Sequence, residues 1–103
     1  MKIVWDPKAK ASRTQIANYI RKEFGAKRKI RYLQDIRETV SKLRYAPNIG
    51  QIDPLFADRP QTYRSIVVNG LNKMVYRIDG DTINIVAFWD TRSESEGQAE
   101  QVK

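Results

Sequence analysis

Residues 63–92 read YRSIVVNGLNKMVYRIDGDTINIVAFWDTR, and they carry the strongest secondary-structure signals in the chain. It contains three runs rich in β-branched and aromatic residues, at 63–68, 73–78 and 82–89. Asn-Gly and Asp-Gly pairs lie between the runs, and these pairs favour tight hairpin turns because both residue types tolerate positive φ. We therefore expect an antiparallel meander of three strands.

Alternation along the middle strand predicts what each face of this sheet carries. Met74, Tyr76 and Ile78 form a coherent apolar set, and the residues between them point to the opposite face. Arg64 is expected on that opposite face too, since burial of an unpaired guanidinium is costly. The sequence thus predicts an uncovered sheet face with three cations: Arg64, Lys73 and Arg77.

Two helices precede the meander. The first begins with Asp6 as N-cap and Pro7 at the first helical position, and it ends at Gly25. The second ends at Ala46-Pro47. Their apolar residues recur at helical spacing, namely Ile16, Tyr19, Ile20 and Phe24 in the first and Ile30, Leu33, Ile36, Val40 and Leu43 in the second. The helices are about 18 and 20 residues long and form an antiparallel hairpin.

A short β-type run at residues 2–5 completes an α+β order of β-α-α-β-β-β, with the helical hairpin packed on one face of a small antiparallel sheet. The run is expected to add an edge or a central strand. Residues 46–62 show no sustained period and are expected to form a loop, ordered or mobile. We expect a single domain over 1–92 and a flexible acidic tail over 93–103.

The composition excludes several kinds of chemistry. The chain has 103 residues with no cysteine and no histidine, so thiolate nucleophiles, most zinc sites and an imidazole base are ruled out. We expect no metal and no cofactor. The longest uncharged apolar run, 83–89, is far shorter than the roughly 20 residues that span a bilayer. A cytoplasmic protein without membrane contact is the expectation.

The charge is strongly basic and unevenly distributed. The whole chain carries +7, while residues 1–92 contain 18 Lys and Arg against 9 Asp and Glu, a net charge of +9. Such a surface favours polyanionic partners, either nucleic acid or an acidic protein segment. Charge that serves solubility alone is the alternative.

Several segments in a fixed order resemble the RelE/ParE superfamily of bacterial type II toxin-antitoxin toxins. They are VWDPKAKA near the start, the helical AKRKIRYLQDIRETVSKLRYAPNIGQ with its Leu43, Pro47 and Gly50 ending, and then YRSIVV, NKMVYRI and INIVAFWDTR. The resemblance covers residues 2–92. It implies a toxin that arrests bacterial growth and that an antitoxin neutralises through an acidic segment.

The resemblance leaves two targets open. RelE-like members cut messenger RNA on the ribosome without a metal, and by position Arg64, Lys73 and Arg92 would be the catalytic cations of such an enzyme. Two departures count against it, because Ile66 stands where a second lysine is expected and no tyrosine follows Arg92. ParE-like members poison DNA gyrase, and the long helices favour that group. A third reading is a non-toxic module that binds an antitoxin.

Candidate target-binding residues lie in two groups. The sheet group comprises Arg64, Lys73, Arg77 and Arg92, and the helix group is the basic run Lys27, Arg28, Lys29 and Arg31. The sheet group admits a plainer reading as solvated charge that prevents edge pairing of the sheet, and the helix group one as a solvated helix face. Cations at the start of a helix are nevertheless unfavourable there, so the helix group invites a binding role.

Overall fold

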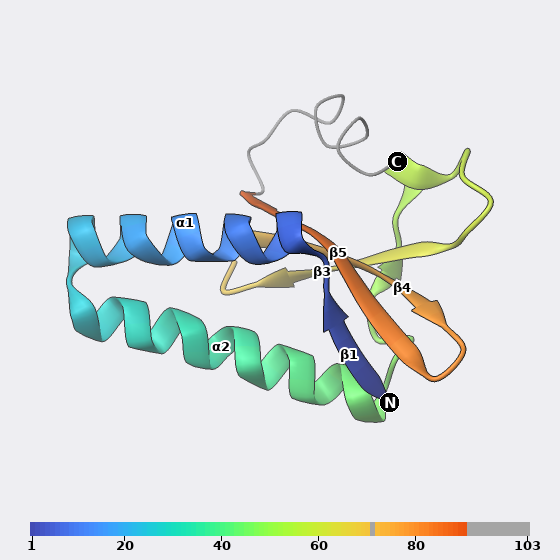
Figure 1. Ribbon diagram of the computed structural model, residues 1–103, viewed down its shortest axis with the longest axis horizontal. Helices are drawn as coiled ribbons and strands as arrows, with labels where there is room; N and C mark the ends of the chain where they lie inside the picture. The colour runs from blue at the N-terminus through green and yellow to red at the C-terminus, as the bar shows by residue number, and fades with distance from the viewer. Residues whose placement is uncertain (71, 91–103) are drawn as a thin grey trace.

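The computed structural model describes residues 1–70 and 72–90 of the chain, shown in Figure 1. In chain order its elements are β1 (Lys2–Trp5), α1 (Pro7–Phe24), α2 (Ala26–Tyr45), β2 (Gln51–Ile52), the 3-10 helix η1 (Pro54–Phe56), β3 (Tyr63–Val68), β4 (Asn72–Asp79) and β5 (Thr82–Asp90). The predicted α+β class and element order are confirmed. The segment expected to be a loop contains β2 and η1 in addition, while the predicted tail and Arg92 lie outside the described residues.

The two helices begin and end as the sequence predicts. The Asp6 carboxylate caps α1 by accepting a hydrogen bond from the backbone N–H of Lys8 at 2.9 Å. Gly25 then reverses the chain with a φ of 95°, a value that disfavours any side chain. The helices have 18 and 20 residues, and they diverge from the Gly25 turn toward the sheet (Figure 1).

The sheet has five strands in the order β1-β5-β4-β3-β2. β1 is an edge strand that pairs in parallel with β5, and all other neighbours are antiparallel. The turn between β3 and β4 contains Asn69 and Gly70 at φ values of 57° and 67°, as a tight Asn-Gly hairpin requires. The predicted meander is therefore present, flanked by one short strand on each side.

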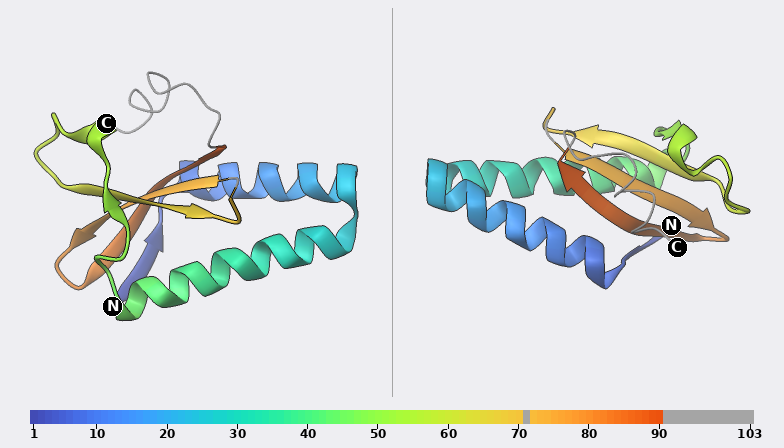
Figure 2. Two further views of the ribbon diagram at one scale, coloured as in Figure 1. Left: turned by 180° about the vertical axis from the view of Figure 1, so that it is seen from behind. Right: turned by 90° about the horizontal axis from the view of Figure 1, so that it is seen from above.

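Both helices cover the same face of the sheet, and the main core lies between the helices and that face (Figure 2). Met74 and Tyr76 are fully buried there and Ile78 packs beside them, as the alternation predicts. Leu43 from α2 is also fully buried in this core. We call this side of the sheet the helix face.

The opposite face of the sheet is not uncovered, and that expectation is corrected. η1 places Phe56 against Tyr63, with ring centroids 5.2 Å apart, and against Trp89, at 6.5 Å. These rings and their neighbours form a second core, made of Phe56, Tyr63, Val75, Ala87 and Trp89. The side chain of Asp53 sets the start of η1 by accepting from the backbone N–H of Leu55 at 3.0 Å. One anchoring ring in an aperiodic segment is enough to cover part of a sheet, and periodicity cannot reveal it.

Candidate functional site

Lys73 lies on the opposite face as predicted, but it is engaged with the chain itself. Its ammonium is 2.7 Å from the Asp53 carboxylate, which is 4% exposed, and 5.9 Å from the centre of the Phe56 ring. An ammonium beside a buried carboxylate compensates the cost of burying that charge. Lys73 thereby holds the β2–η1 segment on the sheet.

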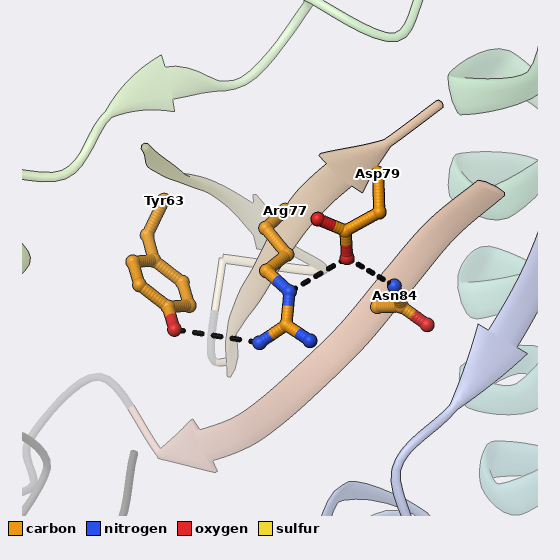
Figure 3. A network of polar contacts seen from close by, with 4 residues as sticks. All are labelled: Tyr63, Arg77, Asp79 and Asn84. Carbon is orange, nitrogen blue, oxygen red and sulfur yellow. Dashed lines mark hydrogen bonds and ion pairs between the residues drawn. The ribbon is translucent and has the colours of Figure 1, made fainter. Parts of the chain in front are cut away.

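Arg77 also lies on the opposite face, within the polar network of Figure 3. Its Nε donates to the Asp79 carboxylate at 2.7 Å and its Nη1 to the Tyr63 hydroxyl at 3.5 Å, while Asn84 donates to the same carboxylate oxygen. The hydrogen bond with Arg77 lowers the pKa of Asp79, and the same bond raises the pKa of Arg77. The network therefore keeps both charges in place and joins three strands, β3, β4 and β5.

Arg64 lies on the helix face, contrary to the expectation that it shares a face with the other cations. It is the cross-strand partner of Tyr76, and directly paired residues point to the same side of a sheet. The guanidinium lies past the end of α2, where Nη1 donates to the carbonyls of Gly50 at 2.8 Å and Asn48 at 3.4 Å. These acceptors remove the burial cost on which the expectation rested.

The segment that follows α2 explains the Leu43, Pro47 and Gly50 pattern. The hydroxyl of Tyr76 donates to the Pro47 carbonyl at 2.7 Å and accepts from the Gly50 N–H at 2.9 Å. A Cβ on Gly50 would lie 2.7 Å from that hydroxyl oxygen, so only glycine fits. Burial raises the pKa of Tyr76 above its ordinary value.

The cations predicted for RNA cleavage thus do not converge within the described residues. Arg64 and Lys73 extend from opposite faces of the sheet, and the third, Arg92, lies outside the described residues. Ile66, which replaces an expected lysine, packs against the main core on the helix face. A single scissile phosphate cannot be held by groups on two sides of one sheet.

The basic run at the start of α2 lies far from the sheet, at the Gly25 turn (Figure 1). Lys27, Arg28 and Arg31 are exposed, and Lys29 is partly buried. The Arg28 guanidinium lies 5.3 Å from the centre of the Phe24 ring, and Arg31 is 3.6 Å from Asp35. The predicted site residues that the structure describes therefore occupy three separate places.

Sequence reasoning missed a pair of hollows between the diverging helices. The first, about 350 Å³, is lined by Arg13, Thr14, Ala17, Asn18, Lys29, Leu33, Ile36 and Arg37. The second, about 250 Å³, is lined by Trp5, Arg13, Ile36, Arg37, Val40, Ser41 and Arg44. We call the two together the interhelical groove, since they share three lining residues. The sequence contained one signal for this groove: on each helix, cations lie one turn away from the apolar residues.

The groove combines apolar and cationic groups. The Arg13 guanidinium stacks over Trp5, 4.4 Å from the ring centre, at the junction of the two hollows. Within residues 1–70 and 72–90, no three acidic side chains gather as a metal site requires. In the same ranges, no helix has the length and apolarity needed to cross a bilayer.

Comparison with known proteins adds a family match and a fold match. The family model described as "ParE toxin of type II toxin-antitoxin system, parDE" matches residues 3–94. Among solved structures, the chain is similar to one in "Chromosomal ParDE TA system from P. aeruginosa", with a TM-score of 0.70 and 24% identity over 87% of this chain and 95% of that one. No curated protein matches. At that identity the structural likeness concerns the fold.

Proposed function

Because the chain belongs to the ParE toxin family of type II toxin-antitoxin systems, we propose that it arrests bacterial growth by poisoning DNA gyrase and that an antitoxin neutralises it. The family match agrees with the predicted RelE/ParE superfamily. Membership alone does not choose the target, so the choice of gyrase rests on how the chain uses its cations.

The observation that carries this choice is the ion pair between Lys73 and Asp53. Metal-free RNA cleavage requires a base for the 2′-hydroxyl, cations around the developing negative charge and an acid for the leaving oxygen. Lys73 contacts a buried carboxylate at 2.7 Å, and Arg64 donates to backbone carbonyls on the other face. Both groups support the fold, which favours a target that needs no catalysis by this chain.

The interhelical groove is the surface we assign to the antitoxin. An acidic amphipathic helix would place apolar side chains against Leu33 and Ile36, and its carboxylates would meet Arg37 and its neighbours on the rim. The net charge of +9 on residues 1–92 would accelerate that encounter. Neutralisation would then act from the helical side of the molecule.

Induced expression in a bacterial host without antitoxin tests the target. We expect growth arrest together with trapped gyrase–DNA cleavage complexes in the cells and in an assay with purified gyrase. Primer extension on translated messages should show no new 5′ ends. New message ends without trapped gyrase complexes would instead identify a ribosome-dependent endoribonuclease.

A soluble, folded chain that leaves growth unchanged would identify a non-toxic antitoxin-binding module. The groove is tested separately by the double substitution Arg37→Glu and Arg44→Glu, which reverses two exposed rim charges. We expect this variant to remain toxic when the antitoxin is co-expressed. The control, Lys8→Glu with Lys10→Glu, changes as much charge outside the groove and should still be neutralised.

A further inference from the structure

A second basic surface lies around the Gly25 turn, and of its cations Lys29 also lines the interhelical groove. Residues 21–31 surround the Gly25 turn and contain six cations against one acid, Glu23. We call these cations the tip patch: Arg21, Lys22, Lys27, Arg28, Lys29 and Arg31. All are exposed except the partly buried Lys29. Arg31 is paired with Asp35 at 3.6 Å, while the others form no ion pair with residues 1–70 or 72–90.

The part of the tip patch on α2 opposes the stability of that helix. Lys27, Arg28 and Lys29 lie in its first turn, where the helix dipole already places positive charge, whereas Arg21 and Lys22 lie in the last turn of α1, where the dipole favours cations. The first turn of α2 contains no acidic residue, and Gly25 supplies no side-chain cap. Mutual repulsion among the cations adds to this cost. The cations in the first turn of α2 therefore cost the helix stability, and this cost favours a role for them outside the fold.

The position of the patch suits contact with a large partner. The Gly25 turn lies at one end of the molecule, beyond the sheet, and both views of Figure 2 show it free of the other described elements. The cations come from the last turn of α1 and the first turns of α2. They therefore form one projecting surface.

We propose that the tip patch binds the phosphate backbone of duplex DNA. Lysine and arginine supply most protein contacts to phosphates, and such interfaces are far more positive than those between proteins, whose centres are depleted of charge. The exposed Phe24 does not make the tip an apolar surface, because the Arg28 guanidinium lies over its ring. Contacts of this kind hold the DNA without reading its sequence.

The choice of DNA over RNA rests on the proposed function, since gyrase acts on DNA. The tip would contact the duplex that the enzyme holds, while another part of the toxin contacts the enzyme. Phosphate binding by the tip is nevertheless measurable without gyrase. The two proposals can therefore fail separately.

Fluorescence anisotropy with a labelled DNA duplex, over a range of salt concentrations, tests the proposal on the full chain. The tip variant carries Lys22→Gln, Lys27→Gln and Arg28→Gln, and the control carries Lys8→Gln, Lys10→Gln and Lys42→Gln. All six positions are exposed, and the control positions lie in the halves of the helices away from the Gly25 turn. Circular dichroism verifies the fold of both variants.

We expect the tip variant to lose on the order of tenfold or more in affinity near 100 mM salt, with a salt slope shallower by about 0.9 for each phosphate contact removed. The control should lose much less. Equal losses in the two variants, or no binding by the wild-type chain, would overturn the proposal. Tighter binding to an RNA duplex of the same sequence would overturn the choice of DNA.

A single substitution, Phe24→Ser, separates DNA contact from protein contact. We expect it to leave both DNA binding and gyrase poisoning close to wild type. If it abolished poisoning while DNA binding stayed intact, the tip would be a protein interface and the proposal would be wrong. If the wild-type chain bound DNA through the tip without poisoning gyrase, the proposed target would fail and the DNA contact would stand.

Discussion

The two faces of the sheet bury their residues in different ways. On the helix face, two long helices lay a periodic apolar stripe over Met74, Tyr76 and the apolar residues of β5. On the opposite face, one ring, Phe56, and one ion pair, between Lys73 and Asp53, hold a short segment against the strands. The first core is distributed over many residues, whereas the second depends on a few.

This difference bears on function. Cations on a sheet are easily read as a binding or catalytic surface, yet those on the opposite face that the structure describes have partners within the chain. Most of the exposed cations in the described residues lie on the two helices, and they include the cations of the groove rim and of the tip. We therefore assign binding to the helical hairpin and structural support to the sheet.

Removing the anchor ring should have the largest effect on the opposite face. Phe56→Ala deletes a side chain that is 2% exposed and contacts two other rings, and we expect it to lower the free energy of unfolding by about 3–5 kcal/mol. Urea denaturation measures this loss. Leu55→Ala, at a partly buried neighbour, should cost clearly less. A loss below about 1 kcal/mol for Phe56→Ala would mean that the second core is not an anchor.

Breaking the ion pair should come next. Lys73→Met leaves the buried Asp53 carboxylate without its closest cation, and we expect a loss of about 3 kcal/mol, since Lys73 is one-fifth exposed and fully buried pairs cost about 3–5. Adding Asp53→Asn removes the carboxylate charge that Lys73→Met leaves unpaired. The amide oxygen of the asparagine can still accept the hydrogen bond from the Leu55 N–H. The double variant should recover much of the stability. A double variant less stable than Lys73→Met would contradict this account of the pair.

Two buried tyrosines on the helix face, Tyr76 and Tyr32, differ in their hydrogen bonds. Tyr76→Phe removes hydrogen bonds to Pro47 and Gly50 and should cost about 1–3 kcal/mol. Tyr32→Phe should be neutral or slightly stabilising, because the buried Tyr32 hydroxyl has no hydrogen-bond partner among the described residues. Differential scanning calorimetry compares the two. Equal losses would contradict the different roles of the hydroxyls.

Burial raises the pKa of both tyrosines above the ordinary 10.0, and this sets a dependence on pH. The stability that arises from a raised pKa is complete below the unfolded value and is lost as the pH rises toward the folded value. The wild-type chain should therefore lose stability above about pH 10. Tyr32→Phe should lose less over the same range.

The surface network should give the smallest effect. Asp79→Asn weakens an exposed ion pair with Arg77, so we expect a loss below about 1 kcal/mol at pH 7. The folded pKa of Asp79 is lowered, so its contribution is present above the unfolded value of 3.8 and is lost as the pH falls through the folded value. The wild type and the variant should converge in urea unfolding at acid pH. A difference that grows in acid would contradict the pairing.

The sequence predicted those parts of the fold that depend on periodic or local signals. The caps at Asp6 and Gly25, the lengths of both helices and the helix-face set around Tyr76 follow from such signals. β2 depends on backbone pairing with β3, while η1 and the covering of the opposite face depend on one ring and one ion pair. None of these has a period in the sequence. The predicted position of Arg64 was wrong, because a guanidinium can donate hydrogen bonds to backbone carbonyls on the helix face. No local sequence pattern reveals those acceptors. The interhelical groove could not be predicted from the sequence, because its existence depends on the angle between the two helices.

Growth arrest by the double variant Lys73→Met and Asp53→Asn shows whether Lys73 serves the fold or a catalytic step. If Lys73 supports the fold and takes no part in catalysis, the folded double variant should arrest growth like the wild type and should still trap gyrase on DNA. A soluble, folded double variant that no longer arrests growth, beside a wild-type chain that cuts translated messages, would contradict the account.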